Sequence, residues 1–215
     1  MISILADNLG LLWDGVLTTL AITALAYLGS VVLGTVVAVF RVSPIPPLRI
    51  LGAVYVELFR NVPLLSLLIL VAYGLPYVGI TLSLFTTAVV SLALVSSSFA
   101  CETVRAGING VSVGQAEAAR AIGMTFTQSL STIILPQALR TMVQPLVNIF
   151  IGVALGSSLA AAVSVGELTY QAQQIGNRTA ESMLLFLISA VVYIVIALLG
   201  GGAGSVLERR LAVRR

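Results

Sequence analysis

The sequence contains no lysine and no histidine, one cysteine and few charged residues of either sign. Without lysine it has no GxxxxGK[ST] phosphate loop, so the chain does not bind and hydrolyse ATP through one. Without histidine it lacks the commonest metal ligand and general base. Cys101 alone excludes an internal disulfide framework and any cysteine-based metal site. We therefore expect no catalytic residue, no metal site and no cofactor held by this chain.

Apolar residues dominate what remains. The chain is 59% hydrophobic and 9% charged, and its mean hydropathy is +1.10. A soluble domain has about 25% charged residues, so this composition indicates an integral membrane protein. Membrane orientation explains the net charge of +3 better than nucleic-acid binding does, and we expect no nucleic-acid partner.

Five apolar stretches are long enough to cross a bilayer, which takes about 20 residues for roughly 30 Å of hydrocarbon. The sequence predicts an all-α integral membrane fold and a single transmembrane domain over residues 1–215. The five transmembrane helices are expected at about residues 13–40, 51–73, 82–106, 137–160 and 182–207. Prolines at 44–47 follow the first span, and Gly74, Pro76 and Gly79 end the second.

Five spans place the two termini on opposite sides of the membrane. With the N-terminus outside, every arginine except Arg178 lies at or near the cytoplasmic side. The opposite topology reverses that count, so the positive-inside rule favours an N-terminus outside and a C-terminus in the cytoplasm.

A polar segment, residues 112–135, separates the third and fourth spans and faces the cytoplasm in this topology. Ser112 with Gln115 and Thr125 with Gln128 have the spacing of two capping boxes. We expect two short helices, residues 115–122 and 126–134, that meet at a turn over Gly123 and Met124. Pro136 is expected at the start of the next span.

Polar residues inside the spans are candidates for a substrate pathway, because transporter sites lie near the midplane at broken helices. The candidates are Ser157, Ser158, Asn148, Ser97, Ser98 and Glu102. Small serines also serve helix packing. Glu102 can also be an interfacial charge paired with Arg105. Glu57 and Arg60 can pair at i, i+3, either as a simple interfacial ion pair or as a gate.

The polar segment resembles the EAA motif of ABC importer permeases. Glu117-Ala118-Ala119 is followed by Gly123 and by the hydrophobic run that ends at Leu135-Pro136. The blocks ELFRNVPLL (57–65), CETVRAGINGV (101–111) and LPQALR (135–140) are similar to those of the polar amino acid permeases of the histidine, glutamine and glutamate type. One departure is the fourth span, where Leu155 and Gly156 stand in place of the polar residues of many relatives and predict a less polar pocket.

The resemblance implies half of a type I importer in a bacterial plasma membrane. A second permease subunit, identical or homologous, completes the pore. Two ATPase subunits, which hold ATP and Mg²⁺, dock from the cytoplasm, and an extracellular binding protein delivers the substrate. It also implies that the polar segment is a coupling helix that contacts the ATPase. The coupling residues are then Gln115, Glu117, Ala118, Ala119, Arg120, Gly123, Met124 and Pro136.

The transported amino acid is indicated by weaker similarities. The blocks RVSPIPPLR (41–49) and LERRLAVRR (207–215) resemble glutamate-type permeases, so we expect glutamate first and glutamine second. The alternatives are an ion-coupled secondary amino-acid carrier or channel and a scaffold that does not transport. An ion-coupled carrier is expected to carry buried acids in several spans, and the apolar stretches 15–40, 141–166 and 182–207 have none.

Overall fold

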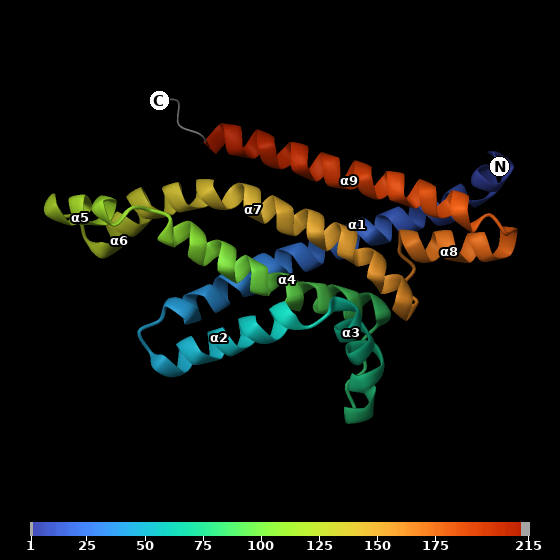
Figure 1. The fold of residues 1–215 in the computed structure, drawn as a ribbon, viewed down its shortest axis with the longest axis horizontal. Coiled ribbons are helices and arrows are strands. Elements are labelled where there is room, and N and C mark those ends of the chain that lie inside the picture. The colour runs from blue at the N-terminus through green and yellow to red at the C-terminus, as the bar shows by residue number, and fades with distance from the viewer. Residues whose placement is uncertain (1, 212–215) are drawn as a thin grey trace.

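The computed structural model describes residues 2–211, and this part of the chain is helical and contains no strand. Figure 1 shows an elongated bundle with α5 and α6 at one end and α8 beside the N-terminus at the other. In chain order the α-helices are α1 (Ile2–Val42), α2 (Pro46–Asn61), α3 (Leu64–Ile69), α4 (Leu84–Asn109), α5 (Val113–Ala121), α6 (Phe126–Ser129), α7 (Leu135–Gly156), α8 (Leu168–Thr179) and α9 (Ser182–Leu211).

The predicted all-α membrane fold is confirmed. Four helical stretches in residues 2–211 are long and apolar enough to cross a membrane, and there are five if the bent pair of α2 and Leu64–Val78 counts as one span. α1 alone has 41 residues. At 1.5 Å per residue it is roughly 60 Å long, about twice the hydrocarbon thickness, so it either tilts strongly or extends beyond the lipid.

The prediction of one continuous second span, residues 51–73, was wrong. α2 ends at Asn61, and the segment Leu64–Val78 leaves it at 101°. Pro63 lies at this break, and Val62 before it is extended, with φ −80° and ψ 126°. A residue that precedes proline is forced out of the helical region, so Pro63 sets the position of the bend.

Beyond the bend the chain forms an arm whose first part, α3, packs on α4 and whose end projects from the bundle (Figure 1). The arm begins with α3 and tightens from a π-helical stretch, Leu70–Gly74, to a 3₁₀ turn, Leu75–Val78. It ends at Gly79, which has φ +84° and closes the turn in a conformation that favours glycine. The break predicted at residues 74–79 is therefore where the arm ends.

The buried core lies where α1, α4 and α7 meet. Ile22 of α1, Leu92 of α4 and Val153 of α7 are at most 1% exposed and belong to one cluster. α4 runs along α1 and contacts α7 on its other side, whereas α9 packs mainly on α7 and α8. α4 and α7 are thus held side by side, and their shared surface forms the cavity described below.

Glu167 caps the N-terminus of α8, just beyond the end of the fourth span, and is fully buried. Its carboxylate accepts hydrogen bonds from the backbone N–H groups of Thr169 at 3.0 Å and Tyr170 at 2.8 Å, and from the Tyr193 hydroxyl at 2.5 Å. The Thr19 hydroxyl accepts a hydrogen bond from the Leu168 N–H. Together these contacts fix α8 against α1 and α9.

We expect Glu167→Gln to change how stability depends on pH. Burial raises the pKa of the Glu167 carboxyl above its ordinary value of 4.5. The folded state therefore favours the protonated carboxyl, and this contribution to stability is present below pH 4.5 and is lost as the pH rises through the raised pKa. The melting temperature of the wild type relative to the variant should fall from pH 4.5 to neutrality. A difference that is constant with pH contradicts the assignment.

Scanning fluorimetry in detergent measures this difference. The exposed carboxylate Glu181, at the start of α9, supplies the matched replacement control, Glu181→Gln.

Candidate functional site

The polar segment begins with the nine-residue helix α5, and the chain changes direction after it at Gly123. Gly123 has φ +83°, its N–H donates to the Arg120 carbonyl at 3.0 Å, and the Met124 N–H donates to the Ala119 carbonyl at 3.1 Å. This is the Schellman arrangement that closes a helix on a left-handed glycine. The predicted turn over Gly123 and Met124 lies where the sequence placed it.

Of the two predicted capping boxes, one forms. The Thr125 N–H donates to Gln128 Oε1 at 2.9 Å, and the Gln128 N–H donates to Thr125 Oγ1 at 3.3 Å. The Ser112 side chain makes no capping hydrogen bond, which corrects the other box. There the Gln115 N–H donates to the Ser112 backbone carbonyl instead, at 3.0 Å.

The sequence predicted that the second short helix is separate from the fourth span, but in the structure the two are continuous. α6 passes into a π-helical stretch, Leu130–Ile134, and then into α7, so residues 127–163 form one continuous helical span. Pro136 lies in the first turn of α7 and does not interrupt it. The wider π turn tolerates a proline that has no N–H to donate.

The coupling residues expected from the sequence lie at one end of the molecule, and most of them are exposed. Gln115, Glu117 and Arg120 point outward from α5, and no ion pair joins Glu117 to Arg120 in the described part of the chain. Ala119 is 1% exposed and packs inside the chain, so only Ala118 of the alanine pair is open to a partner. Gly123 and Pro136 are also exposed, and Met124 is half-buried.

Sequence reasoning missed two apolar residues that frame this surface. Val113 and Ile122, at the two ends of α5, are 69% and 77% exposed. Together with the exposed polar side chains of α5, they give this end of the molecule a mixed apolar and charged surface. Their apolar character within a polar segment was the signal available in the sequence.

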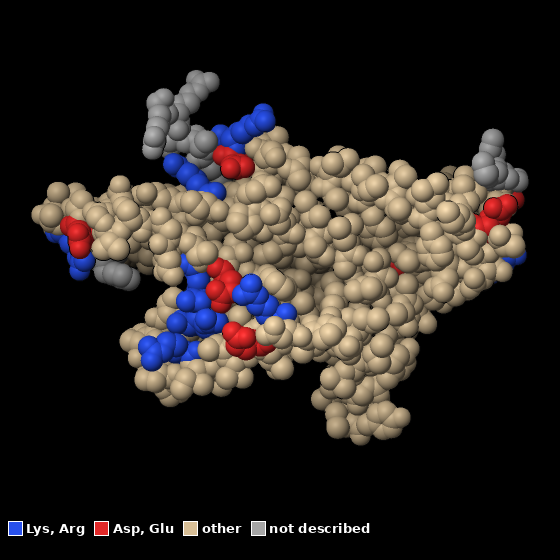
Figure 2. Space-filling view, viewed as in Figure 1, with Lys and Arg blue, Asp and Glu red and all other residues tan. Residues whose placement is uncertain are grey.

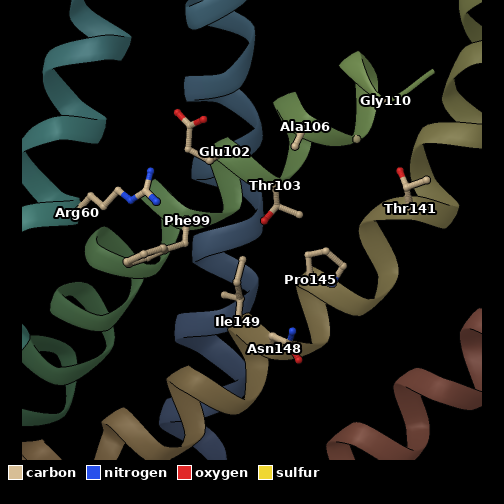
Figure 3. Close-up of a pocket in the computed structure, with 11 residues that line it drawn as sticks. Arg60, Phe99, Glu102, Thr103, Ala106, Gly110, Thr141, Pro145, Asn148 and Ile149 are labelled. Carbon is tan, nitrogen blue, oxygen red and sulfur yellow. The ribbon is translucent and has the colours of Figure 1, made fainter. Parts of the chain in front are cut away.

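A cavity of about 490 Å³ lies between α4 and α7, with α2 at its rim. Figure 3 shows Thr103 of α4 and Asn148 of α7 on its walls, and α1 passing behind it. A second cavity of about 360 Å³ adjoins it and shares the wall residues Phe99, Asn148 and Ile149. The two cavities together form a groove along the surface shared by α4 and α7.

The charged groups of this cavity are unequally neutralised. Glu102 is bonded to Arg41 of α1 at 3.1 Å and to Arg105 at 3.0 Å. Arg60 lies 5.6 Å from the centre of the Phe99 ring and pairs with no carboxylate among the described residues. Three arginines therefore lie near one carboxylate, Glu102, and positive charge is in excess at this rim of the cavity. The orientation predicted from the sequence places this rim toward the cytoplasm.

The Glu57–Arg60 pair allowed by the sequence does not form. Glu57 accepts hydrogen bonds from the Asn61 side-chain amide instead, through its backbone carbonyl at 2.7 Å and its carboxylate at 3.3 Å. Arg60 turns toward α4 because the Phe99 ring offers a face that attracts the guanidinium. Arg60 therefore belongs to the cavity wall, a role that helix spacing alone did not reveal.

Glu102 and Asn148 are the two predicted pathway residues that line this cavity. The four serines do not reach it. Ser97 is buried and bonds to the Tyr55 hydroxyl at 2.7 Å, and Ser98 bonds to a carbonyl of its own helix. Ser157 and Ser158 likewise donate to carbonyls three residues earlier. Three of these serines therefore bond within their own helical segment, and Ser97 also joins α4 to Tyr55 of α2.

Three comparisons with known proteins agree. The family model described as "Binding-protein-dependent transport system inner membrane component" matches residues 30–213. The probable glutamine ABC transporter permease protein GlnM of Bacillus subtilis is 39% identical over 98% of this chain and 97% of its own length. The glutamate transport system permease protein GluC of Corynebacterium efficiens is 34% identical over 92% of both chains.

A solved structure has the same fold. The crystal structure of an amino acid ABC transporter with histidines superposes with a TM-score of 0.90 at 34% identity, covering 96% of each chain.

Proposed function

This chain belongs to the family of binding-protein-dependent transport system inner membrane components and is a permease of ABC importers for amino acids in the bacterial plasma membrane. We propose that it forms half of a pore that is driven by a separate ATPase. A second permease subunit, identical or homologous, completes the pore. Two ATPase subunits bind ATP and Mg²⁺, and an extracellular binding protein supplies the amino acid. An ion-coupled carrier is not favoured, because GlnM and the matching solved structure are both named as ABC transporter proteins.

The orientation we propose has the N-terminus and α8 outside and α5 in the cytoplasm. Figure 2 supports it, since most of the arginine side chains in view gather over the half of the molecule that holds α2, α5 and the end of α9. Positive charge in short loops favours the cytoplasmic side. The coupling segment then projects toward the compartment that contains ATP.

The observation that carries the proposal is the exposed surface of α5. This nine-residue helix exposes Glu117 and Arg120 together with the apolar side chains of Val113 and Ile122. A partner protein can pair with the charges and cover the apolar side chains, which water leaves exposed. The Schellman turn at Gly123 connects this helix to the continuous span of α6 and α7. A movement of the ATPase against α5 is therefore transmitted to α7, which forms one wall of the cavity.

For the substrate we propose a polar amino acid, glutamate first and glutamine second. Glu102 is already paired with two arginines, and Arg60 has no carboxylate partner among the described residues. Such a wall attracts carboxylates, and glutamate has one more than glutamine. The names of relatives support both, because GlnM is named for glutamine and GluC for glutamate.

Purification in mild detergent followed by reconstitution tests the proposal. We expect the chain to be recovered with an ATPase subunit. With the binding protein added, proteoliposomes should accumulate labelled glutamate only when ATP is present. Unlabelled glutamate should compete more strongly than unlabelled glutamine. Uptake by the chain alone, driven by an ion gradient and independent of ATP, would identify a secondary carrier instead.

A further inference from the structure

A second groove lies on the opposite face of α7, between α7 and α9. It consists of two adjoining cavities of about 410 and 220 Å³, and Tyr27 of α1, Val147 of α7 and Leu207 of α9 line both. Arg140 lines the first cavity and Phe150 the second. We call this the α7–α9 groove. Its α7 residues lie about half a turn away from those that line the cavity between α4 and α7, so the two sites are separate.

Close packing of glycines keeps the α7–α9 groove open and rigid. A Cβ atom at Gly200 would lie 2.6 Å from the Phe150 ring, and one at Gly204 would lie 2.2 Å from Val147. Val147 and Phe150 of α7 therefore pack directly on the glycines of α9, and α9 cannot close further onto α7 to fill the space beside them. The groove is a fixed feature of the fold.

The length of the groove matches one leaflet of a bilayer. Arg140 and Phe150 are ten residues apart on α7, which corresponds to roughly 15 Å along the helix axis. One leaflet contributes half of a hydrocarbon core of about 30 Å. A lipid acyl chain that enters beside Arg140 thus reaches the midplane at Phe150.

Among the described residues, Arg140 is the one charged group that lines the groove, and it lies at the mouth that we place toward the cytoplasm. Within residues 2–211 both ion pairs involve Glu102, so no described carboxylate neutralises Arg140. The last turn of α9 adds Arg209 and Arg210, next to Glu208. A half-buried arginine beside apolar walls needs an anion at the depth of the lipid headgroups.

From this juxtaposition we propose that the α7–α9 groove is a binding site for one anionic phospholipid of the cytoplasmic leaflet. An acyl chain lies along Tyr27, Val147 and Leu207, and the headgroup phosphate accepts hydrogen bonds from Arg140. A zwitterionic lipid of the same chain length fills the groove but gains less, since its phosphate is partly neutralised by its own cation. The site therefore selects by headgroup, and lipid bound there braces the span that forms the cavity wall.

Tryptophan fluorescence tests the site in the reconstituted full chain. Trp13 is the only tryptophan, so Trp13→Phe removes the background. Ala203 lines the groove and is exposed, and Ala203→Trp places a reporter there. Brominated phosphatidylglycerol and brominated phosphatidylcholine with the same chains serve as quenchers. We expect the anionic lipid to quench the reporter with about fivefold preference, the effect of one arginine near the surface.

Three variants make the outcome specific. Arg140→Gln should abolish the preference and Arg140→Lys should keep most of it, whereas Arg49→Gln, an exposed arginine on α2, should leave it unchanged. A reporter made by Leu198→Trp, on a 69% exposed position of α9, should show no preference. Equal quenching by both lipids at position 203 overturns the proposal. Absence of quenching by either lipid also overturns it and indicates that a second copy of the chain covers the groove.

Discussion

Replacing Gly123 with aspartate is expected to abolish ATP-driven uptake while the chain remains folded and inserted. Gly123 has φ +83°, a conformation that aspartate tolerates better than most residues, and a Cβ atom there meets nothing within 4 Å. The cost to the fold is therefore small, on the order of 1 kcal/mol. The new carboxylate projects from the tip of the coupling segment, close in sequence to Glu117, into the surface we assign to the ATPase. A carboxylate buried in that interface without a partner should cost about 1.4 kcal/mol or more, so ATPase binding should fall by roughly tenfold or more.

The measurements are co-purification of the ATPase and uptake in proteoliposomes. Gly123→Asn is the matched control, because asparagine has the size and left-handed tolerance of aspartate without its charge, and it should retain most of the ATPase. Glu117→Arg reverses a charge on the same surface and should also abolish uptake. Wild-type uptake and ATPase recovery in both Gly123→Asp and Glu117→Arg would refute the docking role of α5.

The second large effect is expected at Arg60. Arg60→Gln removes the cavity cation that has no carboxylate partner among the described residues and leaves the Glu102 cluster intact. A hydrogen bond to a charged group contributes about 1.5–3 kcal/mol, so the substrate concentration for half-maximal uptake should rise by roughly 10- to 100-fold. Arg60→Lys should recover only part of this, because lysine keeps the charge but not the planar fork that binds a carboxylate with two hydrogen bonds.

Uptake kinetics in proteoliposomes should be read beside ATPase co-purification, which Arg60→Gln should not change. Arg49→Gln, on the same helix but outside the cavity, controls for the loss of one cytoplasmic arginine. An unaltered concentration dependence in Arg60→Gln removes this residue from the substrate pathway. An equal defect in Arg49→Gln assigns the effect to membrane orientation instead.

The prediction of the coupling segment depended on short-range features. Gly123 and the Thr125–Gln128 box act over a few residues, and the turn they specify is the turn that forms. The Ser112–Gln115 box has equal spacing but does not form, because the Gln115 N–H bonds to the Ser112 backbone carbonyl. Spacing therefore identified where the helices meet, but the hydrogen bonds at each end depended on the local backbone.

The substrate candidates were harder to predict because a polar residue in a span can face several neighbours. Ser97 and Ser157 are polar residues of the kind that line a substrate pathway. The Ser97 hydroxyl, however, hydrogen-bonds to the Tyr55 hydroxyl, and the Ser157 hydroxyl donates to a carbonyl one turn away. Glu102 and Asn148 share a cavity although they are 46 residues apart, since α4 and α7 pack side by side. Arg60 lines the same cavity because α2 packs against α4 before the chain bends at Pro63.

By itself the sequence determined that this protein is a helical membrane permease and where the turn over Gly123 and Met124 falls. Those properties depend on the cost of placing backbone and charge in lipid and on contacts between near neighbours, which composition and spacing record. The tertiary structure decided which faces of α2, α4 and α7 enclose the cavity, which arginines pair with Glu102, and how α9 leaves a groove beside α7. Each of these depends on how side chains from distant segments fill a shared space, which no local pattern contains.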